Sequence, residues 1–185
     1  MPIIIKDSPS NFTPAPEGST LAVCVDVVDL GEVKTTWNNV EKIVPKVRLV
    51  FALSERMEDG RPFIASEQYT ASLSEKANLR KVLETWRGRA FTADELKGFD
   101  VETVIGANAI VQIVHAQKGD RTYANIRGII KPVKGMPKMA IPEGYVRVKD
   151  RDPKPSGGVP HNDAPPPSDE DAAPFDDEFD DGLPF

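Results

Sequence analysis

The sequence has one cysteine, two histidines and no apolar run near the roughly 20 residues that a membrane span needs. The single Cys24 excludes an intrachain disulfide framework and is typical of a reducing compartment, where we expect it to be a small core residue. His115 and His161 lie far apart and lack neighbouring ligands at metal-binding spacing, so we expect neither a metal site nor a cofactor. Phosphate-binding loops, dinucleotide fingerprints and nucleophile elbows are also absent. We therefore expect a soluble cytoplasmic protein that is not an enzyme, has no catalytic residue and has no membrane partner.

Charge is divided unevenly along the 185 residues. From Arg151 onward there are 2 basic and 10 acidic residues, a net charge of −8, and the chain totals of 23 and 29 leave 21 basic and 19 acidic residues, or +2, for residues 1–150. A weakly basic body joined to an acidic tail is expected when the body binds a polyanion and the tail does not. The same charges would also let the tail fold back and compete for a cationic groove.

Composition divides the chain into three parts. Residues 1–17 carry four prolines and are predicted to form an N-terminal arm. Residues 18–150 contain the strand-like and helix-like periodicities and are predicted to form one domain. Residues 151–185 are rich in Pro, Gly, Ser and Asp and are predicted to be a disordered acidic tail.

Five stretches of the domain alternate apolar and polar residues as strands do. We predict strands over residues 20–30, 42–54, 62–73, 107–117 and 121–133. Residues 31–41, between the first two, are polar and are predicted to be a connection. Residues 134–150 are predicted to be irregular.

Between the third and fourth strands the period becomes helical, because one face collects Leu79, Leu83 and Trp86. Ser72 with Glu75, and Thr92 with Glu95, are candidate capping boxes, and Gly88 is predicted to end the helix. Three strands, a helix and two strands is the element order of an OB-fold. We predict a mainly β protein with a five-stranded OB-fold barrel and a helix between strands 3 and 4. A non-barrel α+β sheet with the same element order is the alternative.

The last ten residues, DDEFDDGLPF, combine acids with apolar side chains. A terminal Phe ring suits an apolar pocket while its α-carboxylate and the upstream acids meet Arg or Lys, so we predict a partner-binding segment rather than a purely solubilising one. A similar tripeptide, Ala-Pro-Phe, stands ten residues earlier. The candidate partner-binding residues are Phe175, Asp180, Asp181, Leu183, Pro184 and Phe185.

Two resemblances extend this interpretation. Residues 180–185, DDGLPF, resemble the terminus of bacterial single-stranded-DNA-binding proteins, with Gly182 where that family usually carries an acid. Residues 75–135, including LRKVLETWRGRAFT and TYANI, are similar to small bacteriophage proteins identified as single-stranded-DNA-binding or replication-associated. The resemblances imply an OB-fold body that covers single-stranded DNA and a tail that recruits replication or recombination proteins. No catalytic motif accompanies them.

Single-stranded DNA is held by aromatic rings that stack on bases and by cations that follow the phosphates. The candidate DNA-binding residues are Trp37, Lys46, Arg48, Tyr69, Tyr123, Asn125 and Arg127. Trp37 lies in the predicted connection between the first two strands, Lys46 and Arg48 alternate with an apolar face, and the last three share one face of the last strand. For each residue the alternative is an ordinary solvated sheet face or, for the aromatic rings, packing against the core.

Together these features predict a protein that binds single-stranded DNA with little sequence specificity during phage DNA replication or recombination and recruits partners through its tail. Its affinity is expected to fall as salt rises. One alternative is an OB-like adaptor that binds only proteins, and another is a strand-annealing or recombination-mediator protein. A homo-oligomer is compatible with all three.

Overall fold

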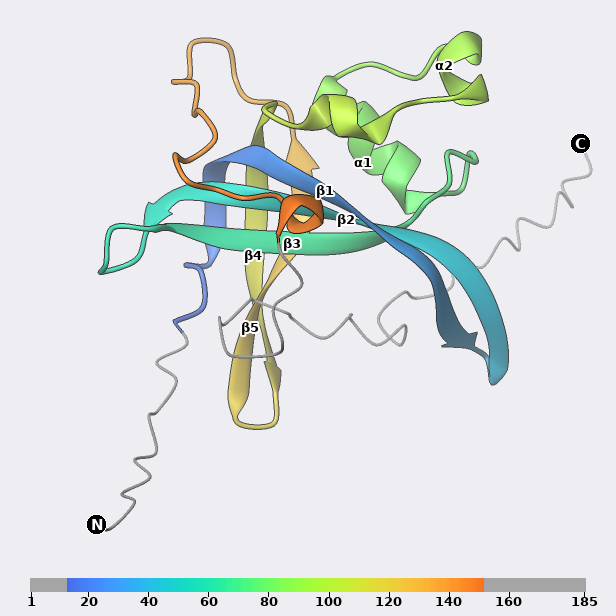
Figure 1. The fold of residues 1–185 in the computed structure, drawn as a ribbon, viewed down its shortest axis with the longest axis horizontal. Coiled ribbons are helices and arrows are strands. Elements are labelled where there is room, and N and C mark those ends of the chain that lie inside the picture. The colour runs from blue at the N-terminus through green and yellow to red at the C-terminus, as the bar shows by residue number, and fades with distance from the viewer. Residues whose placement is uncertain (1–12, 152–185) are drawn as a thin grey trace, which may run out of the picture.

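The computed structural model describes residues 13–151 (Figure 1). Most of the predicted N-terminal arm and nearly all of the predicted acidic tail, including Phe175 and the candidate residues at 180–185, lie outside the described residues. Within them the chain is mainly β, as predicted. Five strands form one antiparallel sheet, and the helix predicted between the third and fourth strands is present.

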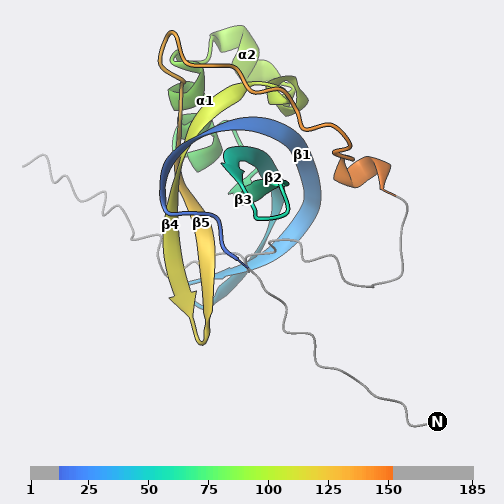
Figure 2. The ribbon, with the colours of Figure 1, turned by 90° about the vertical axis from the view of Figure 1, so that its left-hand side faces the viewer.

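The strands are β1 (Gly18–Trp37), β2 (Val40–Arg56), β3 (Pro62–Thr70), β4 (Asn108–Lys118) and β5 (Arg121–Ile130). The helices are α1 (Asn78–Arg87), α2 (Ala93–Lys97) and the 3-10 turns η1 (Val101–Val104) and η2 (Val148–Asp150). The sheet order is β3-β2-β1-β4-β5. Figure 2 shows that β1 is strongly curved. The outer strands β3 and β5 contact each other. Among residues 13–151, however, these two strands are not paired by hydrogen bonds. The sheet is therefore curved and not closed.

The prediction of a polar connection at residues 31–41 was wrong. These residues belong to the hairpin arm (residues 31–46), in which β1 and β2 continue as a two-stranded ribbon and turn at Asn38 and Asn39. The two Asn residues have φ angles of 48° and 60°, as a type I′ turn requires. Figure 1 shows the arm extending past the other strands. The prediction failed because Lys, Glu and Thr alternate there without an apolar face to mark a strand.

The core lies on the concave side of the sheet. Its strand residues include Ala22, Cys24, Leu49, Phe51, Leu53, Val111 and Ile113. The predicted helical face, Leu79, Leu83 and Trp86, packs against them. Burial raises the pKa of the Cys24 thiol to about 12, so this residue is an unreactive part of the core, as predicted.

The ends of the helices test the predicted caps. Helix α1 begins at Asn78 with Ala77 as N-cap and no side-chain cap, so the capping box predicted at Ser72 and Glu75 was wrong. Gly88 ends α1 in the left-handed conformation, as predicted. The capping box predicted at Thr92 and Glu95 is confirmed at the start of α2.

The segment after β5 crosses the outer face of the sheet, and we call residues 131–151 the strap (Figures 1 and 2). Its Met139 and Tyr145 pack against an apolar cluster on β1 and β2 formed by Val23, Val25, Val50 and Ala52. The Asn108 side chain binds the Met139 backbone through two hydrogen bonds, of 2.9 Å and 2.6 Å. This part of the sheet is therefore covered on both faces.

A buried acid fixes the end of the strap. Asp26 of β1 is only 1% exposed, and it accepts hydrogen bonds from Arg147 Nε at 3.0 Å and from the Val148 N–H at 2.7 Å. Arg147 also donates to Glu102 of η1 at 2.6 Å. Glu102 and then Asp26 raise the pKa of Arg147. Because an unpaired buried carboxylate would be strongly unfavourable, these contacts tie the strap to the sheet.

Candidate nucleic-acid interface

Lys46 and Arg48 lie on the outer face of β2, beyond the cluster that the strap covers. In the ladder with β3, Lys46 pairs with Thr70 and Arg48 pairs with Gln68. Both cationic side chains are partly exposed. Together with their polar partners they form a cationic surface on β2 and β3, as the alternation in the sequence predicts.

The same alternation continues into the hairpin arm. Outward from Lys46, the ladder pairs on this side are Val33–Val44, Thr35–Lys42 and Trp37–Val40. Trp37, predicted in a loop, is instead the last residue of β1 beside the turn. Lys42 is exposed, and Val40 and Ile43 are 54% and 60% exposed. Val40 was missed because residues 31–41 were predicted to be a connection, whereas Lys42 and Ile43 lay in the predicted strand 42–54 and were not singled out as candidates.

The predicted row on β5 is interrupted. Tyr123 and Asn125 pair with Ala116 and Val114 of β4 and are partly exposed. A bulge follows, because Ile126 pairs with Ile113 and Gly128 pairs with Gln112, so Arg127 has no ladder partner. Only Tyr123 and Asn125 therefore keep the regular alternation.

Tyr69 lies on the inner face of β3 and packs against the core. Burial, followed by the charge of Glu67, raises the pKa of its hydroxyl. Burial also raises the pKa of Glu67 itself to about 7, against the opposing effects of a backbone hydrogen bond at Gln68 and of the Arg127 charge. A ring that packs against the core does not offer an open face to a base, so this position does not favour Tyr69 as a stacking residue.

Five of the seven candidate residues thus fall into two groups. Trp37, Lys46 and Arg48 belong to the β1–β2 hairpin, whereas Tyr123 and Asn125 belong to the β4–β5 hairpin, and Figure 1 shows the two hairpins as separate ribbons. At the tip of the second ribbon, the exposed Lys118 and Arg121 flank the turn. The structure therefore groups cationic and aromatic residues at two loops and on the face of β2 and β3.

Among residues 13–151, no group of three or more His, Cys, Asp or Glu side chains is placed to hold a metal ion. None of the described helices is long and apolar enough to span a membrane. A comparison of the sequence with protein-family models and with curated proteins finds no match.

Proposed function

We propose that this protein binds single-stranded DNA through the β1–β2 hairpin and the adjoining face of β3. The observation that carries the proposal is the outer face of the hairpin. Lys46 and Arg48 lie on this face at the base of the hairpin arm, and Trp37 lies at its tip as the last residue of β1. Cations in this position would neutralise phosphates and release counterions, and an aromatic residue at the tip would stack on a base. Neither contact reads base edges, so binding would be largely independent of sequence.

The architecture supports an OB-fold as part of the same proposal. The ladder order β3-β2-β1-β4-β5, the helix between β3 and β4 and the contact between β3 and β5 are what a partly open OB barrel would have. OB-folds bind oligonucleotides on strands 2 and 3 and on the loops that join strands 1–2 and 4–5. The two groups of candidate residues lie at these places.

The proposed role is to cover single-stranded DNA in replication or recombination, with the acidic tail recruiting other proteins. The divided charge of the sequence supports this role, as do its resemblances to bacterial and phage single-stranded-DNA-binding proteins. The exposed Val40 and Ile43 favour one second candidate, an adaptor that binds only proteins through the arm.

The test is a fluorescence-anisotropy titration of a labelled oligo-dT with the full chain at two salt concentrations. We expect saturable binding that weakens as salt rises. A Trp37→Ala variant should lose about 1 to 3 kcal/mol of binding free energy. Absence of binding at both salt concentrations would reject the DNA-binding proposal and favour the adaptor.

A further inference from the structure

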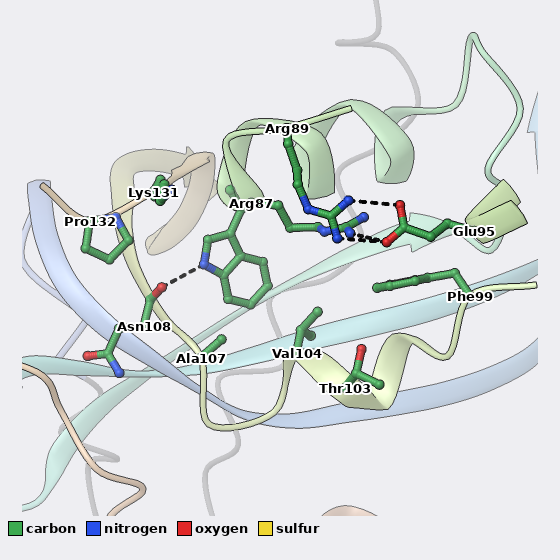
Figure 3. A pocket seen from close by; sticks show the side chains of 11 residues that line it. Arg87, Arg89, Glu95, Phe99, Thr103, Val104, Ala107, Asn108, Lys131 and Pro132 are labelled. Atoms are coloured by element: carbon green, nitrogen blue, oxygen red, sulfur yellow. Dashed lines mark hydrogen bonds and ion pairs between the residues drawn. The ribbon is translucent and has the colours of Figure 1, made fainter. Parts of the chain in front are cut away.

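A pocket of about 460 Å³ lies between α1, α2, η1 and the segments next to β4 and β5 (Figure 3). This volume is within the range of small-ligand sites. The apolar part of its lining includes Trp86, Phe99, Val104, Ala107 and Pro132. Its charged residues are Arg87, Arg89, Lys131 and Glu95. None of the lining residues belongs to β1, β2 or β3, so the pocket is separate from the proposed DNA-binding face.

Arg87 is the most informative residue of this pocket. Its guanidinium lies over the rings of Phe91 and Phe99, at 4.5 Å and 5.2 Å from their centroids, and it forms an ion pair with Glu95. Its Nη1 atom is buried and has no hydrogen-bond partner among the described residues. A buried charged donor without an acceptor is unfavourable, so an oxygen that entered here would be stabilised.

The pocket is also positively charged. Arg89 donates to both carboxylate oxygens of Glu95, at 3.2 Å and 2.8 Å. The Thr92 N–H, followed by Arg89 and Arg87, lowers the pKa of Glu95 to about 2, so this acid is ionised at neutral pH. Three cations and one anion leave a net charge of +2, which favours an anionic occupant with an apolar side chain beside its charge.

The end of the described chain contacts η1, one of the elements that line this pocket. Lys149 donates to Glu102 at 3.2 Å, and Glu102 is followed by the pocket residue Thr103. The acidic residues 152–185 come next, and in them Phe175 and Phe179 are each followed by Asp. The stretch from 152 to 175 has 24 residues and is rich in Pro, so at about 3.1 Å per residue it would reach up to about 75 Å from Arg151 if fully extended.

We propose that the pocket binds residues 175–180 (FDDEFD) of the same chain. A Phe ring would enter beside Val104 and Phe99, and a neighbouring carboxylate would accept hydrogen bonds from Arg87 Nη1 and Arg89. Because the segment belongs to the same chain, its binding would be intramolecular and independent of protein concentration. The pocket is thus an intramolecular receptor for the middle of the acidic tail, which leaves residues 183–185 free for other proteins.

The pocket suits this segment better than a nucleotide. Trp86 is only 4% exposed, packs on Phe51 and donates its indole N–H to the Asn108 carbonyl at 2.8 Å. Phe99 is contacted by Phe91 edge to face and by Arg87. A base would therefore find no open ring on which to stack. Phosphate contact alone is an outcome that the test distinguishes.

The test uses the full chain, labelled with ¹⁵N, without DNA. The Trp86 indole N–H reports on the pocket wall, and the Trp37 indole is the internal reference. A Phe175→Ala/Phe179→Ala variant should shift the Trp86 resonance and leave that of Trp37 in place. Phe185→Ala, which removes a ring from the same tail without changing its side-chain charge, is the matched control and should shift neither.

The pocket side is tested with Arg89→Ala, whose side chain is 56% exposed, against Lys97→Ala, which changes a 76% exposed cation on α2. When Phe175→Ala and Phe179→Ala are added to Arg89→Ala, the Trp86 indole resonance should move much less than when they are made in the wild-type chain. In Lys97→Ala their effect should be unchanged. In the wild-type chain, the position of the Trp86 indole N–H resonance should not depend on protein concentration. A concentration dependence would assign the occupant to another copy of the chain and contradict the proposal.

Three other results would overturn the inference. One is an unchanged Trp86 resonance in the Phe175→Ala/Phe179→Ala variant, and another is an equal shift in Phe185→Ala. The third is a Trp86 shift caused by oligo-dT but by neither tail variant, which would make the pocket a phosphate site. Because the tail experiment contains no DNA, a tail-dependent shift would support the inference even if the proposed DNA binding failed.

Discussion

The two halves of the β1–β2 hairpin have opposite surroundings. In the inner half, strand residues such as Phe51 face the core, and the cluster Val23, Val25, Val50 and Ala52 on the other face lies under the strap. In the hairpin arm, Val40 and Ile43 are more than half exposed. Backbone pairing continues through both halves, but burial, which supplies most of the stability of a fold, is concentrated in one. The arm, together with the neighbouring Arg48 beyond the strap, is therefore the part of the hairpin whose outer side chains are available for binding.

The largest expected effect is the loss of a core ring from the inner half. Phe51 is fully buried and packs against Trp86 at a centroid distance of 5.4 Å. Phe51→Ala should lower the free energy of unfolding by about 3 to 5 kcal/mol. In the arm, Ile43→Ala should change it by less than about 0.5 kcal/mol. Urea unfolding followed by circular dichroism would measure both, and similar losses would contradict the division into two halves.

The next effect concerns the strap that covers the outer face of the inner half. Arg147→Met removes the ion pair of Asp26 and leaves that carboxylate, among residues 13–151, with the hydrogen bond from the Val148 N–H. Because Asp26 is almost completely buried, we expect a loss of about 3 kcal/mol in the same unfolding experiment. Lys149→Met removes only an exposed contact to Glu102 and is the matched control, with little change expected. Equal stability of the two variants would show that the strap is not held through Asp26.

A smaller effect is expected at Glu67, on the inner face of β3. The pKa of Glu67 is raised to about 7 from an ordinary value of 4.5, so the folded state holds this proton more tightly than the unfolded state. The resulting stabilisation is fully present below about pH 4.5 and is lost as the pH rises through about 7. The change in the free energy of unfolding caused by Glu67→Gln should therefore be about 1 to 3 kcal/mol more favourable at pH 8 than at pH 4.5.

Thermal and urea unfolding at the two pH values would test the Glu67 prediction. Glu41→Gln, at an exposed position of the arm, is the control and should change stability little at either pH. If Glu67→Gln is no more favourable at pH 8 than at pH 4.5, burial is not what raises the pKa of this carboxyl group.

The smallest effect is on the salt dependence of DNA binding. Lys46→Ala should remove one phosphate contact, which lowers the slope of log affinity against log salt by about 0.7 for single strands. The exposed Arg61, in the turn between β2 and β3, pairs with Asp59, and Arg61→Ala should leave the slope unchanged. Anisotropy titrations over a series of salt concentrations would separate the two variants. A slope unaffected by Lys46→Ala would remove this residue from the interface.

Periodicity was sufficient to predict the elements that have a buried face. The inner parts of the strands and the Leu79–Leu83–Trp86 face of α1 alternate with the expected period because packing selects their apolar residues. Residues 31–41 of the hairpin arm escaped prediction because both faces of the arm are solvated, although Asn38-Asn39 is a turn signal that would have marked the hairpin.

The covering of the sheet could not be predicted from local patterns. Arg147 and Asp26 are separated by 121 positions, and the strap between β5 and η2 has no regular periodicity. Tyr69, in contrast, lies on the same side of β3 as the buried Phe63 and Ala65, so alternation along β3 indicates its inward orientation. Lys46 and Arg48 were predicted as outward-facing because alternation alone determines their side of the strand.

Amide hydrogen exchange of the full chain, with and without oligo-dT, tests the central contrast most directly. Amides of the inner half should exchange slowly in both states, whereas amides of residues 31–46 should exchange faster in the free protein and slow down when oligo-dT is bound. Protection that appears on another surface, with the arm unchanged, would contradict the assignment of DNA binding to this half of the hairpin.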